Sequence, residues 1–284
     1  MKIVLPEGKI IKTGGKTVKN VAGYNLSRLF TGSMGTLGAI YEVTFKLSPT
    51  PIDNQSLLLC TDHLPNLASF TKSVLSSKLV LSRLDYFNHS FFNKAFNQKN
   101  IPQRAHYVII NIMGHPDMTT NGLNRLVQLS KDHHLEERLV LNHSEESEYW
   151  NKLCENDYFV SLPQGSVSIQ ISVPKVSLWT LLDIQQNDLN KQAAFHALAG
   201  NGILNIYFHN LNHGVSKLES IIEHYRSIVR NLGGNLIINH APLEIRKSDI
   251  IWGNAEIIQP LLRQIKKEYD PEKIIAAGRF IGEI

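Results

Sequence analysis

One order of hydrophobic patterns occurs twice between residues 55 and 240, and it limits the possible folds more than any other feature of the chain. Alternating runs rich in β-branched residues predict strands, whereas apolar residues spaced three and four apart predict amphipathic helices. The first set predicts, in chain order, strand 56–61, helix 64–77, strands 80–87 and 106–113, helix 119–133 and strand 137–141. The second set predicts strand 167–173, helix 176–185, strands 193–198 and 203–209, helix 216–232 and strand 236–240.

Both sets have the order βαββαβ, which is that of the split βαβ or ferredoxin-like unit. Two such units can extend one antiparallel sheet whose helices cover one face. Their sequences are not obviously similar, so the repetition is one of architecture. An acidic helix over 144–155 is expected between them. The sequence therefore predicts an α+β chain with a doubled ferredoxin-like antiparallel domain at residues 52–255.

A shorter segment with different patterns precedes the repeat. Strands 2–5 and 9–13 flank the turn Pro6-Glu7-Gly8, which favours an antiparallel hairpin. The run 39–47 alternates and is rich in β-branched and aromatic residues, so it predicts a strand that ends before Pro49-Thr50-Pro51. We place a domain boundary there.

Two helices are expected outside the repeat. Asn25 can cap helix 26–30, because its side-chain oxygen can accept a main-chain N–H bond, and Gly32 ends this helix. Near the other end of the chain, 256–269 predicts a helix. Residues 256–284 are thus expected to form a C-terminal helix and a short tail.

Composition excludes several classes of protein. Of 284 residues, 43% are hydrophobic and 19% are charged, which is typical of a globular chain and excludes a disordered one. The net charge of +4 is spread without a Lys/Arg block, so nucleic acid is not an expected partner. Two cysteines, Cys60 and Cys154, are too few for a disulfide framework, which predicts a cytoplasmic protein. No apolar run suits a signal peptide or a transmembrane segment.

Glycine is frequent between residues 14 and 38, where the chain offers its densest chemical signal. Gly32, Gly35 and Gly38 would let main-chain N–H groups approach an anion closely, because no Cβ stands in the way. The hydroxyls of Ser33 and Thr36, which lie between them, could donate to it. Such a loop suits a pyrophosphate. Its spacing matches neither a P-loop nor a Gly-x-Gly-x-x-Gly turn, and an ordinary turn is the alternative, so the residues alone leave the ligand unnamed.

A resemblance to a known family names that ligand. The string from Lys19 to Ile40 resembles the second half of the FAD-binding domain in the vanillyl-alcohol oxidase/PCMH flavoprotein superfamily, and in particular the FAD-binding subunit of glycolate oxidase. The tail from Asp270-Pro271 to Gly278-Arg279-Phe280 resembles the family's terminal motif. The resemblance implies that residues 1–51 are a partial PCMH-type FAD-binding lobe that lacks its N-terminal part, and that the tail returns to this lobe.

Matched position by position, the resemblance assigns FAD binding to a small set of residues. Most of them would line the loop near the diphosphate and ribityl portions of the cofactor. Ile40 would add main-chain contacts from the next strand, and Asn20 would lie near the same cofactor. The full set is Asn20, Gly32, Ser33, Gly35, Thr36, Gly38 and Ile40.

Departures from the family pattern exclude other sites. Relatives that oxidise D-2-hydroxy acids carry two histidines in a His-Ala-Gly-Asp-Gly-Asn-Leu-His type segment. The matching stretch has Leu198 and Asn205 in the histidine places, and leucine cannot ligate a metal. His196 shares a strand face with Leu198 and is expected to be structural. Ala276-Ala277 replace an Asn-Pro pair near the flavin. We therefore predict no metal site and no catalytic residue.

The function implied by the resemblance is that of the FAD-binding subunit, or a truncated part of one, in a glycolate oxidase-like complex that oxidises a 2-hydroxy acid. Its partners would be a catalytic flavoprotein subunit, an iron-sulfur subunit and a separate N-terminal FAD lobe. Through partner subunits it would lie peripheral to the inner membrane. The alternative is a non-catalytic assembly module or remnant that no longer binds FAD.

A lobe that lacks its first part is expected to expose Ile3, Leu5, Ile10 and Leu37.

Overall fold

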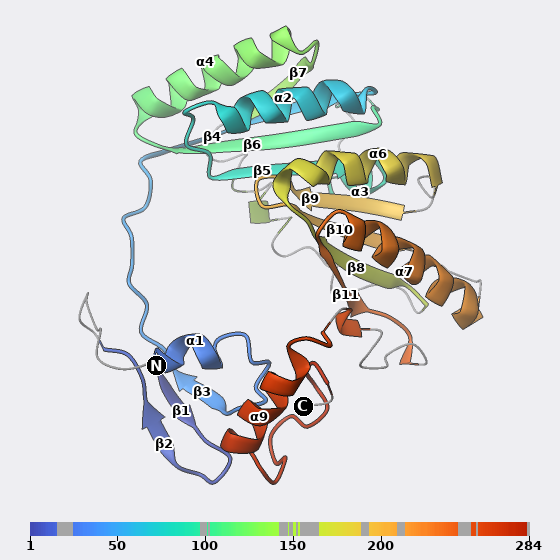
Figure 1. Cartoon of the computed structure of the whole chain (residues 1–284). Helices are drawn as coiled ribbons and strands as arrows, with labels where there is room; N and C mark the ends of the chain where they lie inside the picture. The colour runs from blue at the N-terminus through green and yellow to red at the C-terminus, as the bar shows by residue number, and fades with distance from the viewer. Residues whose placement is uncertain are drawn as a thin grey trace. The chain divides into compact units, whose positions relative to one another are not determined.

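The computed structural model describes residues 1–15, 25–96, 101, 103–141, 147, 150, 151, 153, 165–188, 193–208, 214–243, 251–253 and 255–282. The chain divides into two compact units, whose elements are labelled in Figure 1. Thr50–Ile245 make up the larger unit, and Met1–Pro49 join Arg246–Ile284 in the smaller one. The domain borders placed at residues 51 and 255 from the sequence stay predictions.

The larger unit contains one eight-stranded sheet in the order β11-β8-β10-β9-β5-β6-β4-β7, and every pair of neighbours is antiparallel. Its strands are β4 (Asp53–Thr61), β5 (Arg83–Asn88), β6 (His106–Gly114), β7 (Glu136–Leu141), β8 (Val167–Ser172), β9 (Ala193–Leu198), β10 (Ile203–Phe208) and β11 (Asn235–His240). In each half the first and third strands are central, as in a ferredoxin-like unit. The halves join where β5 pairs with β9, which confirms the predicted doubled antiparallel fold.

Helices of the larger unit lie along one face of this sheet in Figure 1. They are α2 (Leu64–Ser76), α4 (Pro116–Asp132), α6 (Leu178–Asp188), which follows the 3-10 turn η1 (Lys175–Ser177), and α7 (Gly214–Asn231). The contact of α4 with β6 is close, because a Cβ added to Gly122 would lie 2.7 Å from Ile112 Cδ1. The α4 helix therefore covers the face of β6 to which Ile112 points.

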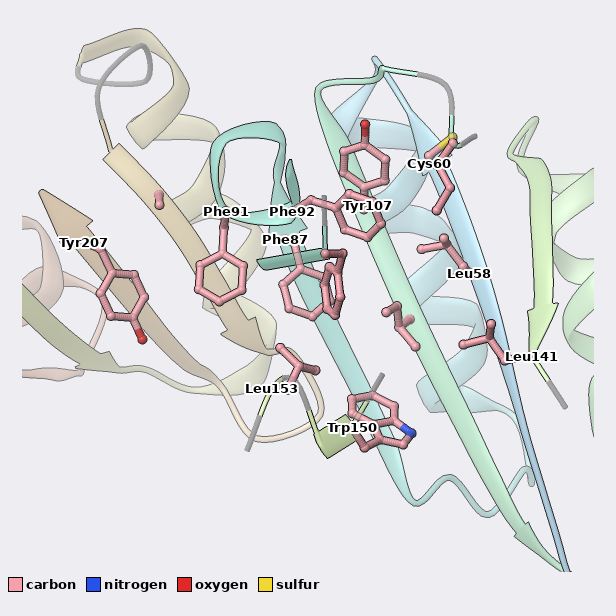
Figure 2. Packing of buried hydrophobic residues seen from close by; sticks show 14 residues of the cluster. Leu58, Cys60, Phe87, Phe91, Phe92, Tyr107, Leu141, Trp150, Leu153 and Tyr207 are labelled. Atoms are coloured by element: carbon pink, nitrogen blue, oxygen red, sulfur yellow. The ribbon is translucent and has the colours of Figure 1, made fainter. Parts of the chain in front are cut away.

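The opposite face of the sheet is covered by aromatic side chains. A helix that the sequence patterns did not predict, α3 (His89–Phe96), supplies Phe91 and Phe92, and Figure 2 shows them beside Phe87 and Tyr107. The Phe92 and Tyr107 rings stack with their centroids 3.9 Å apart. Side chains alternate along β6, so Tyr107 points to the face opposite α4. Other residues must therefore bury its ring on that face. The four helices predicted from the repeat lie along one face, and α3 is an additional helix on the other.

The smaller unit contains a three-stranded antiparallel sheet in the order β2 (Ile10–Lys12), β1 (Lys2–Val4) and β3 (Ala39–Glu42). Among its described residues, α1 (Leu26–Phe30) and α9 (Gln259–Tyr269) are helices. Ile3, Leu5 and Leu37 are buried, although they were expected to be exposed, and only Ile10 of that set is exposed. The cover comes from Phe30 of α1 and from α9, which packs Ile265 and Tyr269 against the same core.

Several element ends differ from those predicted. The strand expected over 39–47 ends at Glu42, because β3 pairs only with the three-residue β1. Asn25 occupies the N-cap of α1, but its side chain makes no capping hydrogen bond. The C-terminal helix begins three residues later than expected, with Pro260 in its first turn, where a missing N–H costs nothing.

Most of the predicted 144–155 helix lies outside the described residues. None of the described helices is long and apolar enough to cross a membrane.

Candidate functional site

The glycine loop joins α1 to β3 and has an unusual backbone. Thr31 ends α1, and the next residue, Gly32, has φ +82°, as expected for a glycine just beyond a helix end. Met34 and Gly35 follow with φ values of +55° and +77°. These left-handed conformations are costly for residues that have a Cβ, so the loop depends on its glycines.

The predicted glycines divide into two kinds. A Cβ added to Gly32 or Gly35 would meet no atom within 4 Å, so their main chain borders open space. A Cβ added to Gly38 would lie 2.9 Å from Ile3 Cγ2 and 3.0 Å from the Val4 carbonyl oxygen. Gly38 is therefore required for packing against β1, whereas Gly32 and Gly35 leave room for a ligand beside the backbone.

The two hydroxyls of the loop serve the loop itself. The Ser33 hydroxyl donates to the Phe30 carbonyl at 2.9 Å, and the Thr36 hydroxyl donates to the Ser33 carbonyl at 2.7 Å. Both residues are buried. Their protons are thus committed within the loop, and donation to an anion, which the sequence led us to expect from these hydroxyls, would fall to main-chain N–H groups.

A buried ion pair lies directly behind this loop. Lys266 of α9 donates to the Thr36 carbonyl oxygen at 2.7 Å and to Asp270 Oδ2 at 2.5 Å. Asp270 in turn accepts the main-chain N–H groups of Ile274 and Ile275, both at 2.9 Å. Burial alone would raise the pKa of the Asp270 carboxyl, but the bonds from Lys266 and from these two N–H groups outweigh it and hold the pKa below its usual value.

A cavity of about 200 Å³ opens between the loop and α9. Its lining combines apolar side chains with the loop residues and contains no charged group: Leu29, Thr31, Gly32, Ser33, Thr36, Leu37, Leu262, Ile265 and Phe280. An uncharged ring fits such a wall better than a charged group does. Three residues of the predicted cofactor set, Gly32, Ser33 and Thr36, therefore line one cavity.

The other described positions of the predicted set are not among the residues that line this cavity. Gly35 borders open space, and Gly38 packs against Ile3 and Val4. Ile40 belongs to β3, where it pairs with Ile3 and is 40% exposed. Asn20 lies outside the described residues. Lys266 was missed, although a lysine four residues before an aspartate on a predicted helix is a recognisable ion-pair spacing.

The larger unit shows what occupies the places of the family's histidines. Leu198 ends β9, and Asn205 of β10 accepts a hydrogen bond from Gln170 Nε2 at 3.1 Å. His196 bonds through Nε2 to Asp85 at 3.1 Å, and Arg83 bonds to the same carboxylate oxygen at 2.9 Å. Among the described residues, no three His, Cys, Asp or Glu side chains converge as a set of metal ligands.

A second, larger hollow of about 570 Å³ lies where the two halves of the sheet meet. Leucines line much of it, and Arg83, Asp85 and Lys175 supply its charged groups. Because Arg83 and Asp85 already neutralise each other, the hollow offers no converging pair of free charges. The glycine loop is the better candidate for a site.

No protein-family model matches the chain. Glycolate oxidase subunit GlcD of Bacillus subtilis (strain 168) is 39% identical over 88 residues, which are 31% of this chain and 19% of that protein. The GlcE protein of the Escherichia coli (strain K12) glycolate oxidase is 46% identical over 56 residues, or 20% of this chain and 16% of that protein. An uncharacterized FAD-linked oxidoreductase of Mycobacterium tuberculosis, Rv2280, aligns with the whole chain at 22% identity. These relatives are thus named as two glycolate oxidase subunits and one FAD-linked oxidoreductase.

One solved structure resembles nearly the whole chain in its fold. The crystal structure of p-cresol methylhydroxylase with substrate bound matches 98% of this chain and 64% of its own, with a TM-score of 0.71 and 14% identity. This chain therefore shares the fold of p-cresol methylhydroxylase over the matched residues, as the sequence predicted. This chain spans 64% of the length of Rv2280 and 52% of the length of a mitochondrial D-lactate dehydrogenase of Arabidopsis thaliana.

Proposed function

We propose that this chain is the FAD-binding subunit, or a part of one, of a glycolate oxidase-like flavoprotein complex that oxidises a 2-hydroxy acid. Support comes from the names of its homologues, which are glycolate oxidase subunits and D-lactate dehydrogenases. Its partners in this proposal are a catalytic flavoprotein subunit, an iron-sulfur subunit and a separate N-terminal FAD lobe.

One observation carries the proposal to this chain's own residues. The main chain at Gly32 and Gly35 borders open space beside a cavity, so a ligand can approach the backbone as closely as FAD binding requires. The cavity of about 200 Å³ is smaller than the usual range for a whole ligand, so it would take one portion of FAD. Its apolar lining suits a ring, and the diphosphate would lie over the loop N–H groups.

The residues of this chain would act on the cofactor by holding it. When bound, FAD supplies the hydride acceptor, and the protein contributes orientation, polarity and exclusion of water. Leu262, Ile265 and Phe280 would exclude water from one side of the bound portion, while Gly32 and Gly35 would give main-chain contacts on the other. No described side chain is proposed as a proton donor or acceptor in the reaction.

The test is a titration of the purified chain with FAD, followed by flavin fluorescence. We expect saturable binding that Gly35→Val weakens at least tenfold, because its side chain fills the space beside the loop. Gly8→Val is the matched control, since Gly8 has φ +83° and equally open surroundings but lies in the hairpin between β1 and β2. Equal affinities for the two variants would contradict the proposed site.

The alternative is a non-catalytic assembly module that does not bind FAD. A colourless chain that binds no FAD, alone or together with glycolate oxidase-type partner subunits, would favour this alternative. A flavin absorbance band in the purified chain would exclude it.

A further inference from the structure

The Lys266 side chain connects three separate parts of the smaller unit. Its ammonium group donates to the Thr36 carbonyl in the loop, to Asp270 at the end of α9 and to the Ile275 carbonyl in the tail, at 2.7, 2.5 and 2.9 Å. An ammonium group has three hydrogens, so each of them has a partner. Lys266 is 3% exposed and Asp270 is fully buried. The loop, the helix and the tail therefore meet at one charged atom.

Stability alone is a weak reason for such a pair. Taking two charges out of water is costly, and apolar residues of similar volume often give equal or higher stability at such places. A buried charge does, however, require its partners at fixed positions, because a missing partner leaves the charge unpaired. The pair thus specifies where Thr36 and Ile275 lie relative to α9.

The position of Thr36 bears directly on the candidate cavity. Thr36 lines that cavity, as do Leu262 and Ile265 from the helix that carries Lys266. Its hydroxyl also bonds to the Ser33 carbonyl, so a shift of Thr36 would move Ser33, another lining residue. The Lys266 bond therefore connects the two walls of the cavity, the loop and α9.

We propose that Lys266 is a positioning residue that couples docking of the C-terminal segment, from α9 to Ile275, to the shape of the glycine loop that receives FAD. This inference rests on the proposed function, because it takes FAD to be the ligand of the loop. Coupling between two binding events is reciprocal. FAD binding at the loop therefore stabilises the docked C-terminal segment, and the docked segment strengthens FAD binding.

The experiment compares Lys266→Ala with Lys267→Ala in the full chain. Lys267 is the next residue of α9 and is exposed, so it serves as the matched control. FAD affinity is measured at a temperature at which circular dichroism shows both variants folded. We expect Lys266→Ala to weaken FAD binding at least tenfold and Lys267→Ala to leave it within twofold of the wild type. Propylammonium, which replaces most of the lost side chain, should restore the affinity of Lys266→Ala.

Hydrogen exchange supplies a readout that a merely structural role would not change. In the wild type, saturating FAD should slow exchange at residues 259–275 at least fivefold, although most of these residues lie outside the cavity lining. In Lys266→Ala this protection should disappear. The double variant Lys266→Met/Asp270→Asn leaves neither charge unpaired, so it keeps the test available if Lys266→Ala does not fold.

The outcomes separate the two ideas. If the wild type binds FAD and a folded Lys266 variant binds it equally well, the coupling is refuted and the proposed function stands. If FAD binds without slowing exchange at 259–275, the coupling is likewise refuted. If the wild type binds no FAD, alone or with its partner subunits, the proposed function fails and the coupling fails with it.

Discussion

Replacing Asp85 by alanine tests the polar group buried between the two halves of the large sheet. Asp85 lies on β5 and is 1% exposed, and it accepts hydrogen bonds from Arg83 at 2.9 Å and from His196 of β9 at 3.1 Å. Removing one partner of a buried ion pair costs about 3–5 kcal/mol. Because the Arg83 side chain is 30% exposed and can regain water, we expect the lower end, about 3 kcal/mol.

The matched control is Asp62→Ala. Asp62 also bonds to an arginine, Arg104, at 2.7 Å, but its side chain is 48% exposed, and exposed pairs contribute about 0–1 kcal/mol. Each aspartate has an arginine and one further partner, which is the Ala105 main-chain N–H for Asp62 and His196 for Asp85, so the two variants differ chiefly in burial.

Thermal unfolding followed by circular dichroism measures the difference. For a unit of this size, each kcal/mol lowers the melting temperature by about 2–4 °C, so Asp85→Ala should lower it by about 6–12 °C. Asp62→Ala should lower it by no more than about 4 °C. Equal shifts for the two variants would refute the reasoning that burial of the Asp85 pair joins the two halves of the sheet.

Two further predictions concern packing and pH. Gly38→Ala should destabilise the smaller unit by about 1–3 kcal/mol, because its Cβ would press on Ile3 and Val4, whereas Gly200→Ala, whose Cβ meets no atom within 4 Å, should leave the unfolding midpoint nearly unchanged. Burial lowers the pKa of His106 to about 4. His106 therefore takes up a proton near pH 6.5 in the unfolded chain but stays neutral at that pH in the folded chain. Stability should therefore be complete above pH 6.5 and fall by about 3 kcal/mol as the pH drops toward 4, a loss that urea titrations of His106→Asn should no longer show.

The α3 helix shows why one element escaped prediction. The α3 helix begins at the residue directly after β5, so no glycine or proline marks the change from strand to helix. The available signal was Asn88, whose side-chain oxygen accepts the Phe91 N–H at 3.0 Å, as an N-cap does. The same oxygen also accepts the Phe195 N–H from β9 at 2.9 Å, a contact across 107 residues that no local pattern contains.

The candidate site shows a similar division. The glycine loop was recognisable in the sequence, because a run of glycines and hydroxyl residues between a helix and a strand is a local signal. The sequence did not show whether each glycine leaves room for a ligand or packs in the core, because Gly35 and Gly38 differ only in the atoms that surround them. The inward hydroxyl bond of Thr36 likewise became visible only in the folded loop.

The sequence by itself determined most of the elements and their order, with α3 as the exception. Periods of two and of 3.6 residues are properties of neighbouring positions, so they predict strands and helices, and their doubled order predicts the antiparallel ferredoxin-like sheet. Only the tertiary structure decided which residues meet across the chain. Lys266 donates a hydrogen bond to the Thr36 carbonyl over a separation of 230 residues. Residues of α9 pack against the core that contains Ile3 of β1, which was expected to be exposed. The physical reason is that burial and pairing depend on the atoms that surround a residue in the fold, whereas periodicity reports only on its neighbours in the chain.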